Sequence, residues 1–350
     1  MATKYAGLCI GVTGLNANDN PGPGIAVIRA LKEGLGSEIR IIGFAYESLE
    51  PGIYMRELVD KTYQLPYPTA GTGALLERLT YINNQENLTA IIPNFDAELH
   101  NFIIIAPSLL KIGIRTFLPS LAQLQVRDKA NLFEFGNKNE LRVPPHYNLF
   151  SAADLSHATE ELGFPLVIKG KFYDAYIVVN MDAALKAFKQ LEAAWGYPVI
   201  AQKYIKGTEI NVAALGAGNG SNLSIVPMRK LYITEKGKAW AGVTIEDNAL
   251  VKLADQFAKA TQWRGAYELE IIRDAEDQLF IIEINPRFPA WIYLAAVAGQ
   301  NQPSALIKMS MGENVAPFNS YETGKLFIRH SWDQVVDIAE FQKMSAFGEL

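Results

Sequence analysis

Cysteine is almost absent from this chain. Among its 350 residues only Cys9 is a cysteine, which excludes a disulfide framework and a thiolate metal cluster. Cys9 lies in an apolar, strand-like run, so we interpret it as an inert core residue. The four histidines, His100, His146, His157 and His330, lack the spacing of metal ligands, and we interpret them as structural or surface residues.

Long apolar runs and an excess of positive charge are also lacking. No apolar stretch reaches the roughly 18 residues of a membrane span, and the first residues form no signal-peptide core. We therefore expect a cytoplasmic protein with no membrane partner. The net charge of −5 argues against nucleic acid as the main partner. A composition of 49% hydrophobic and 20% charged residues is typical of a globular protein, and the length allows two or three domains.

The first 118 residues alternate between strand and helix patterns. The pattern predicts strands at 8–13, 39–45 and 89–92, and helices that begin at Gly24 and cover 75–82 and 98–110. This alternation predicts an α/β domain with a parallel sheet. The loop from Gly14 to Gly24 follows the first strand, at the sheet edge where such folds bind ligands. It lacks the G-x-G-x-x-G spacing of a dinucleotide fingerprint.

The rest of the chain has a different pattern, with helices between successive short strands. Helices are predicted at 128–135, 152–162, 182–194, 247–261, 290–299 and 304–311, and extended segments at 143–147, 166–169, 176–179, 199–204, 209–217 and 223–233. This order predicts an α+β domain with an antiparallel sheet rather than a continuation of the first domain.

The most informative segment is Ile-Ile-Glu-Ile-Asn-Pro-Arg-Phe at 281–288. Side chains alternate along a strand, so Glu283, Asn285 and Arg287 point to one face. Two oxygen donors and a guanidinium at a strand end suit Mg²⁺ bridged to phosphate, because Mg²⁺ binds carboxylate, amide and phosphate oxygens.

A second strand at 267–272 precedes this segment after a turn at 273–278. If Ile272 pairs with Leu279, Glu268 lies opposite Glu283; a register shifted by two residues brings Glu270 there instead. Two carboxylates about 4 Å apart repel by roughly 4 kcal/mol at an effective dielectric near 20. A divalent cation between them removes this cost. The alternative is a solvated sheet edge, which leaves Asn-Pro-Arg without a role, so we favour the metal site.

The order of these elements resembles the ATP-grasp superfamily. It comprises Lys129, Lys169 after an apolar strand, the segment 201–209, Glu270 and the Glu283-x-Asn-x-Arg287 motif. The resemblance is strongest to the carbamoyl phosphate synthetase large-subunit and biotin carboxylase branch. It implies a pre-ATP-grasp α/β domain at 1–118, a small ATP-grasp subdomain with the hinge at 119–205, and a large subdomain at 206–350. It also implies ATP, one or two Mg²⁺ ions and a homodimer.

The resemblance assigns a role to each matching residue. Lys129 and Lys169 would contact the phosphates, although exposed surface lysines are the simpler alternative. Gln202, Lys203 and Ile205 would meet the adenine; an acidic residue is common where Gln202 stands, and an amide still offers a donor and an acceptor. Glu209 would contact the ribose or a lysine. Mg²⁺ would be bound by Glu270, Glu283 and Asn285. Arg287 would stabilise charge on the transferred phosphoryl group and on the acyl phosphate.

The phosphate-covering loop departs from the family pattern. A mobile glycine-rich loop usually follows the second lysine, whereas Lys169 is followed by Gly170-Lys-Phe-Tyr-Asp-Ala175, which has one glycine. Lys171 would supply charge in place of backbone donors. We therefore expect slow turnover or a partner that completes the lid.

Substrate contacts are predicted from charge and position. Arg229 and Lys230 are candidates to bind an acid, with an exposed strand-edge pair as the alternative. Asp96 and Glu98, after the strand near residue 92, are candidates to bind an amine. The alternative for Asp96 is that it caps the helix that follows.

Three functions are compatible with these residues. The first is a carboxylate–amine ligase that forms an acyl phosphate from a small-molecule acid, such as an amino acid or peptide-like acid, and passes it to an amine. The second is an ATP-binding regulatory or scaffold protein of the same fold, which the short loop favours. The third is a dinucleotide-dependent oxidoreductase, against which the absence of the glycine fingerprint argues.

Overall fold

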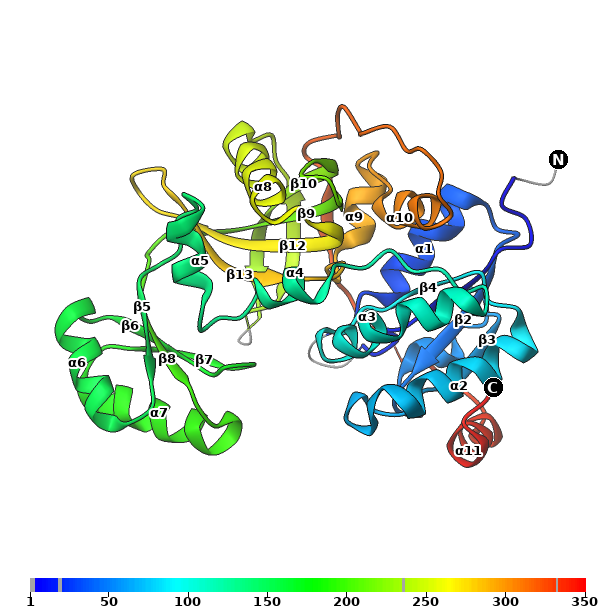
Figure 1. Ribbon diagram of the computed structural model, residues 1–350, viewed down its shortest axis with the longest axis horizontal. Helices are drawn as coiled ribbons and strands as arrows, with labels where there is room; N and C mark the ends of the chain where they lie inside the picture. Colours follow the sequence, from blue (N-terminus) through cyan, green and yellow to red (C-terminus); the bar gives the residue numbers. More distant parts are fainter. Residues whose placement is uncertain (1–3, 18–20, 235–236, 332) are drawn as a thin grey trace. The chain divides into compact units, whose positions relative to one another are not determined.

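A computed structural model describes residues 4–17, 21–234, 237–331 and 333–350 (Figure 1). Residues 18–20 of the predicted ligand loop lie outside the described residues. The chain divides into two compact units. Unit 1 comprises Met1–Leu121, Val212–Glu268 and Asn285–Leu350, and unit 2 comprises Ala122–Asn211 and Leu269–Ile284. The division into three segments at 118 and 205 stays a prediction.

Unit 1 begins with a parallel sheet in the order β3-β2-β1-β4, as the βαβ pattern predicts. The strands are β1 (Cys9–Val12), β2 (Arg40–Ala45), β3 (Lys61–Gln64) and β4 (Ala90–Ile92), and the helices are α1 (Gly24–Leu35), α2 (Gly71–Glu86) and α3 (Asp96–Lys111). β3 was not predicted, because Lys-Thr-Tyr-Gln contains no apolar run.

Gly24 shows why α1 begins where it does. Its backbone N–H donates to the carbonyl of Gly14 (2.9 Å), and a Cβ at this position would lie 2.4 Å from the carbonyl oxygen of Thr13. Only glycine allows this close approach of two backbone segments. Val27, Ile28 and Leu31 then follow at helical spacing and are fully buried.

The second sheet has six strands in the order β13-β12-β9-β10-β11-β14. Its strands are β9 (Thr208–Ala217), β10 (Asn222–Ile233), β11 (Ala239–Thr244), β12 (Arg264–Arg273), β13 (Leu279–Asn285) and β14 (Leu326–Ile328). The boundaries of the two units fall inside β9, β12 and β13. β11 pairs antiparallel with β10 and with β14, so the predicted antiparallel sheet is confirmed. β11 and β14 themselves were not predicted, since Ala-Trp-Ala-Gly-Val-Thr and a three-residue strand carry little local signal.

The other helices of unit 1 are short, except for α8. α8 (Asn248–Thr261) is capped by the Asp247 carboxylate, which accepts from the backbone N–H groups of Ala249 and Leu250. The remaining elements are α9 (Ile292–Val297), α10 (Gln302–Ser310), α11 (Ile338–Phe347), η1 (Pro51–Tyr54) and η2 (Pro68–Ala70), and α4 (Leu121–Gln125) begins at the boundary with unit 2. After α11, Leu350 exchanges two backbone hydrogen bonds with Thr62, which extends the edge at β3.

Unit 2 contains an antiparallel sheet in the order β5-β8-β6-β7. The strands are β5 (His146–Leu149), β6 (Leu166–Lys169), β7 (Ala175–Val178) and β8 (Val199–Lys203), and the helices are α5 (Leu132–Lys138), α6 (Ala152–Leu162) and α7 (Met181–Trp195). α6 and α7 cover one face of this sheet (Figure 1), where Leu166 and Ile168 are fully buried against Phe188 and Leu191. Because side chains alternate, Val167 and Lys169 point to the other face.

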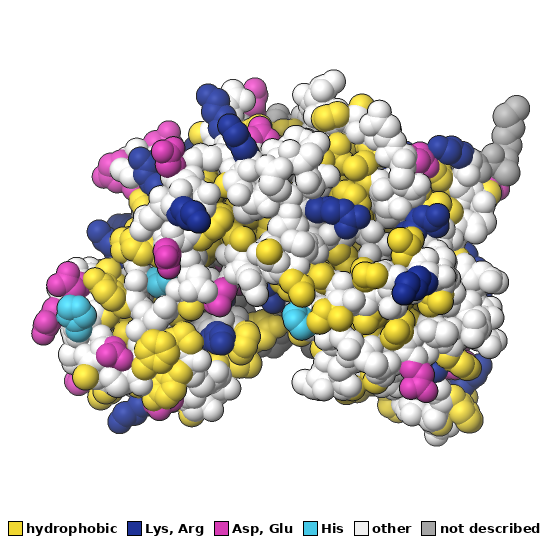
Figure 2. All heavy atoms as spheres, in the orientation of Figure 1, with side chains coloured by type: hydrophobic (Ala, Val, Ile, Leu, Met, Phe, Trp, Pro, Cys, Tyr) yellow, Lys and Arg dark blue, Asp and Glu magenta, His cyan; other side chains and the backbone are white. Residues whose placement is uncertain are grey.

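Two features of unit 2 bear on the predicted site. The helix expected at 128–135 begins only at Leu132, because residues 128–131 form a turn in which the Asp128 carboxylate accepts from Ala130 N (3.0 Å). Hydrophobic side chains also gather on the surface of this unit (Figure 2). Ile177 and Val179 are 63% and 67% exposed, next to the short loop.

No helix in the described part of the chain is both long enough and apolar enough to cross a membrane.

Candidate functional site

Four of the predicted site residues form one charged cluster in unit 2. Lys129, in the turn before α5, places its Nζ 3.2 Å from Oε1 of Glu283. The same ammonium donates to the carbonyl of Phe172 (3.1 Å) in the short loop. The Lys129 side chain is only 18% exposed. It is therefore not the solvated surface lysine that was the simpler alternative.

Lys169 ends β6 on the sheet face that α6 and α7 leave uncovered. Burial, and to a smaller extent the positive charge of Lys129, lower the pKa of the Lys169 ammonium to about 8. The carboxylates of Glu283 and Glu270 act in the opposite direction. Two lysines and two glutamates from three separate chain segments thus lie within electrostatic reach of one another.

In the β12–β13 hairpin a side-chain contact bears on the two registers that the sequence allows. Asn285 Nδ2 donates to Oε2 of Glu268 at 3.0 Å. The contact is the one expected from the register that places Glu270 opposite Glu283, because a step back along one antiparallel strand matches a step forward along the other. The contact therefore disfavours the register in which Ile272 pairs with Leu279.

Glu268 is a residue of this hairpin that sequence reasoning did not assign. It is 4% exposed, and it accepts hydrogen bonds from Asn285 and from the Trp291 indole N–H (2.8 Å). The hydrogen bond orients the Asn285 amide, with its nitrogen toward Glu268. The signal in the sequence was the alternation of Glu268 with Glu270 on one strand face.

Arg287 forms a partly buried ion pair with Asp96 in unit 1. The Arg287 Nε–Asp96 Oδ2 distance is 2.9 Å, and Arg287 Nη1 donates to the carbonyl of Phe288 (3.1 Å). Asp96 is the first residue of α3, whose N-cap is Phe95. The alternative that Asp96 caps this helix is therefore wrong.

Glu98 does the capping instead, and it lies in a buried polar network. Its Oε1 accepts from the backbone N–H groups of Asn94 (2.8 Å) and Phe95 (2.9 Å) and from the Thr13 hydroxyl (2.5 Å). Its Oε2 accepts from the Tyr46 hydroxyl. Burial raises the pKa of Glu98, and these donors oppose the rise. Both carboxylate oxygens of Glu98 therefore accept hydrogen bonds within the protein. The predicted role of Glu98 in binding an amine stays a prediction.

The predicted adenine contacts lie at and beyond the end of β8. Gln202 is 4% exposed and pairs with His146 on β5 and Val167 on β6. It therefore shares a sheet face with Lys169, since Lys169 is two positions after Val167 on the same strand. Lys203 is exposed, whereas Ile205 and Glu209 are half-buried.

The predicted acid-binding pair lies on β10 in unit 1. Arg229 is exposed and pairs with Val243 on β11. Lys230 is half-buried and donates to the carbonyl of Gly237 (3.3 Å). Their role in substrate binding stays a prediction.

The loop after Lys169 is a tight turn. Gly170 N donates to the carbonyl of Asp174 (3.0 Å), and Asp174 Oδ2 accepts from the Trp195 indole N–H (2.9 Å). A Cβ at Gly170 would lie 2.3 Å from the carbonyl oxygen of Tyr173, so this glycine permits the turn. Lys171 points its Nζ toward the ring of Phe172, 5.5 Å from the centroid. The exposed side chains of this turn include the aromatic rings of Phe172 and Tyr173. Residues 170–175 of the turn have no run of glycine N–H groups like that of the family's usual loop.

The side chains of this cluster and its neighbour Asn285 match the ligand preference of Mg²⁺. Across the described residues no three His, Cys, Asp or Glu side chains group closely enough to hold a metal by themselves. The carboxylates of Glu270 and Glu283 both act on Lys169, and Asn285 follows Glu283 on the same strand face. These are hard oxygen donors whose charge is now matched by two lysines, and they fit an Mg²⁺ ion whose shell is completed by phosphate oxygens.

Comparison with protein families supports the resemblance drawn from these residues. Residues 197–328 match the family model described as an ATP-grasp in the biosynthetic pathway with Ter operon. The chain is 24% identical over 258 residues to the carbamoyl phosphate synthase large chain of Clostridium acetobutylicum, which covers 69% of this chain and 24% of that protein. It is 26% identical over 178 residues to the D-alanine–D-alanine ligase of Ectopseudomonas mendocina, covering 47% of this chain and 56% of that one. The chain thus spans about a quarter of the synthase and about half of the ligase.

Solved structures share the fold over most of the chain. A biotin carboxylase from Campylobacter jejuni in complex with β,γ-ATP has a TM-score of 0.70 at 18% identity, over 90% of this chain and 73% of that one. N5-carboxyaminoimidazole synthetase from Staphylococcus aureus has a TM-score of 0.68 at 17% identity, over 92% and 82% of the two chains. At these identities the similarity shows the fold, which is the predicted ATP-grasp fold of the biotin carboxylase type.

Proposed function

The chain carries an ATP-grasp domain within an ATP-grasp fold, and from this premise we propose that it is an ATP-dependent carboxylate–amine ligase. The proposal rests on one observation, the cluster of Lys129, Lys169, Glu270 and Glu283. A carboxylate oxygen of the acid attacks the γ-phosphorus of ATP, and ADP leaves. The amine then attacks the acyl phosphate, phosphate leaves, and the amine loses a proton.

The two lysines bind the triphosphate in this proposal. An ammonium with a pKa near 8 is partly deprotonated at slightly alkaline pH, and an adjacent phosphate favours its charged form. Without nucleotide, Lys129 forms an ion pair with Glu283. When a phosphate binds, Lys129 exchanges this carboxylate for the phosphate as its anionic partner. Gln202, Lys203 and Ile205 contact the adenine, and Glu209 contacts the ribose or a lysine.

Glu270, Glu283 and Asn285 would hold one or two Mg²⁺ ions, which neutralise charge on the triphosphate when bound. The hydrogen bond from Asn285 Nδ2 to Glu268 fixes which end of the amide is the nitrogen, so the carbonyl oxygen would be the atom that binds the metal. Trp291 fixes Glu268 from its other oxygen, so the orientation of Asn285 is supported by a second layer of contacts.

Arg287 stabilises charge on the transferred phosphoryl group and on the acyl phosphate. Its ion pair with Asp96 fixes the guanidinium in unit 1 before substrates bind. A preorganised cation of this kind lowers the barrier without reorganising during the reaction. Arg229 and Lys230 remain candidates for the acid, and Asp96 and Glu98 for the amine of an amino acid or small peptide-like substrate.

The test measures ADP release with Mg²⁺ and ATP across a panel of small acids and amines. Wild-type protein should release ADP only when a productive pair is present, and Glu283→Ala should abolish this release. Glu276→Gln, in the exposed turn of the same hairpin, is the matched control and should behave as wild type. Undiminished release by Glu283→Ala would reject the assignment, and ATP binding without turnover across the panel would favour the regulatory or scaffold alternative.

A further inference from the structure

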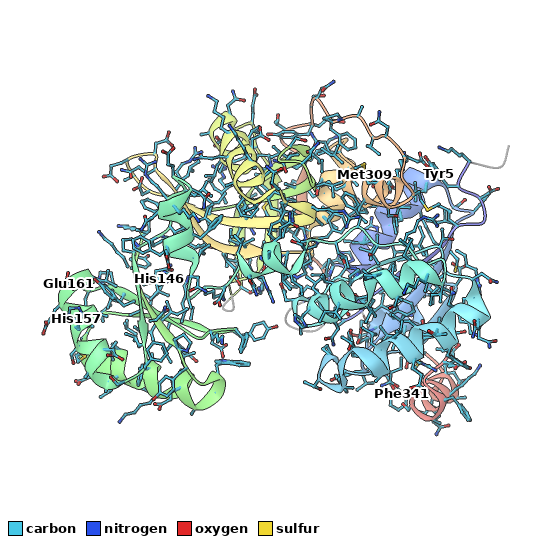
Figure 3. All side chains as sticks on the ribbon, in the orientation of Figure 1. Tyr5, His146, His157, Glu161, Met309 and Phe341 are labelled. Carbon is cyan, nitrogen blue, oxygen red and sulfur yellow. The ribbon has the colours of Figure 1, made fainter. Side chains whose placement is uncertain are left out.

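Two side chains of β5 converge on one backbone carbonyl. His146 and Asn148 are two residues apart, so they share a strand face. His146 Nε2 lies 3.2 Å, and Asn148 Nδ2 3.0 Å, from the carbonyl oxygen of Ala130 (Figure 3 labels His146 on β5). Ala130 directly follows Lys129, so both contacts act on the residue next to this lysine.

The state of the His146 ring is set by its surroundings. A carbonyl oxygen only accepts, so Nε2 must carry the hydrogen. Burial lowers the pKa of His146, the hydrogen bond to the Ala130 carbonyl opposes this, and the nearby positive charge of Lys169 lowers the pKa again. Nδ1 is buried and has no hydrogen-bond partner among the described residues. The ring therefore donates to the Ala130 carbonyl through Nε2.

Besides the contacts of the Lys129 side chain with Glu283 and Phe172, short-range contacts close the turn that carries this lysine. The Asp128 carboxylate accepts from Ala130 N, and the Asp128 carbonyl accepts from Asn131 N (both 3.0 Å). These bonds close the turn but do not tie it to the sheet. The hydrogen bonds from His146 and Asn148 do, and they connect the turn to the strand that lies beside Gln202 on β8.

We propose that His146 and Asn148 are positioning residues that hold Lys129 in place for the nucleotide phosphates. This inference rests on the proposed function, because it needs Lys129 to bind phosphate. The two residues themselves bind neither substrate nor metal. They fix the peptide after Lys129, and this limits the positions that its Nζ reaches between Glu283 and the loop carbonyl of Phe172.

The first experiment compares nucleotide affinities by calorimetry. Asn148 is exposed, so Asn148→Ala removes a donor at little risk to folding. Loss of one hydrogen bond should weaken ATP and ADP binding about five- to tenfold, and adenosine binding should not change. His146→Phe should act in the same way, and His146→Gln, whose amide nitrogen again donates, should recover most of the affinity. Tyr147→Phe, on the opposite strand face, is the control and should match wild type.

The second experiment separates positioning from a general structural role. In a Lys129→Met background, Asn148→Ala should produce no further loss of ATP affinity, because the lysine being positioned is gone. The proposal would be overturned if Asn148→Ala lowered ATP affinity by the same factor with and without Lys129. It would also be overturned if the two single variants, Asn148→Ala and His146→Phe, both bound ATP as tightly as wild type.

The third experiment does not depend on nucleotide binding. The rate at which an amine-reactive reagent labels Lys129, measured by mass spectrometry, should rise several-fold in Asn148→Ala, while labelling of Lys171 stays unchanged. If wild-type protein binds no ATP, the ligase proposal fails, and this labelling change alone still decides whether the two residues restrain Lys129. Unchanged labelling of Lys129 would overturn the restraint.

Discussion

Lys129 lowers the pKa of Lys169, although each of these ammonium groups has a glutamate within reach. The two lysines therefore repel each other before any phosphate is present. Replacing Lys129 by Met removes this repulsion, and the pKa of Lys169 should rise above its present value of about 8.

The measurement is a pH titration of ¹³C-methylated lysines by NMR, with Lys129→Met compared with wild type. Lys171→Met is the control, because the side chain of Lys171 points toward Phe172 and Lys171 is not among the charges that shift Lys169. An unchanged or lower pKa of Lys169 in Lys129→Met would show that the two ammonium groups do not interact.

Nucleotide affinity should fall as the pH rises through the pKa of Lys169. In the protein without nucleotide this lysine loses its proton near pH 8. The bound triphosphate favours the charged form, so binding above that pH must be accompanied by proton uptake and becomes weaker. We expect about a tenfold loss of affinity between pH 7.5 and 9.5, a range in which the phosphates are already ionised.

Calorimetry in buffers of different ionisation enthalpy measures both the affinity and the proton uptake. Lys169→Met should bind ATP more weakly than wild type at pH 7.5 and should lose the pH dependence. A variant with unaltered pH dependence would place the titrating group elsewhere.

Several parts of the site could be predicted because local sequence specifies them. The apolar run 166–168 ends in Lys169, and its alternation with buried residues predicts both the strand and the direction of the lysine. α6 begins and ends at the predicted residues, because Ser151 caps it at the start and Gly163 follows its end. The segment 281–287 was recognised from three polar side chains on one strand face.

Other parts depend on contacts that the sequence does not specify. The sequence does not specify that Asn285 lies beside Glu268, since a strand of alternating residues fits either of the two registers. Lys129 lies in a turn and not in a helix, because the Asp128 side chain competes for the backbone. His146 was interpreted as structural or surface, since nothing in its neighbourhood along the chain points to Ala130, sixteen residues earlier.

The ion pair between Asp96 and Arg287 should matter more for turnover than for nucleotide binding. Asp96→Asn keeps the shape of the side chain and removes the charge that fixes the guanidinium. If Arg287 acts on the transferred phosphoryl group, kcat should fall about tenfold or more while ATP affinity changes little. Steady-state kinetics and calorimetry on the same samples measure the two effects. The control is Glu77→Gln, because Glu77 is an exposed residue of α2. Asp60→Asn is unsuitable as a control, because the Asp60 carboxylate accepts a hydrogen bond from Ile41 N. A loss of affinity with unchanged kcat would contradict the role.

Glu50 should make unit 1 less stable as the pH rises toward neutrality. Its side chain is 6% exposed, and Oε1 accepts from the backbone N–H groups of Tyr46 (2.7 Å) and Glu47 (3.2 Å), whereas Oε2 is buried with no partner among the described residues. Burial raises the pKa of Glu50 to about 7, and the two backbone donors oppose the rise.

A carboxyl group with a higher pKa in the folded state than in the unfolded chain holds its proton more tightly when folded. Its contribution to the free energy of unfolding is therefore most favourable below the unfolded pKa of about 4.5, declines between about 4.5 and 7, and stays low above pH 7. Glu50→Gln keeps an acceptor for Tyr46 and Glu47 and carries no charge. We expect this variant to be more stable than wild type at pH 8 by up to about 3 kcal/mol, and nearly equal to it at pH 4.5. Urea unfolding at both pH values measures the difference, and the exposed Glu57→Gln is the matched control. A Glu50→Gln variant that is no more stable than wild type at pH 8 would mean that the buried carboxylate is compensated by a cation or an ordered water molecule.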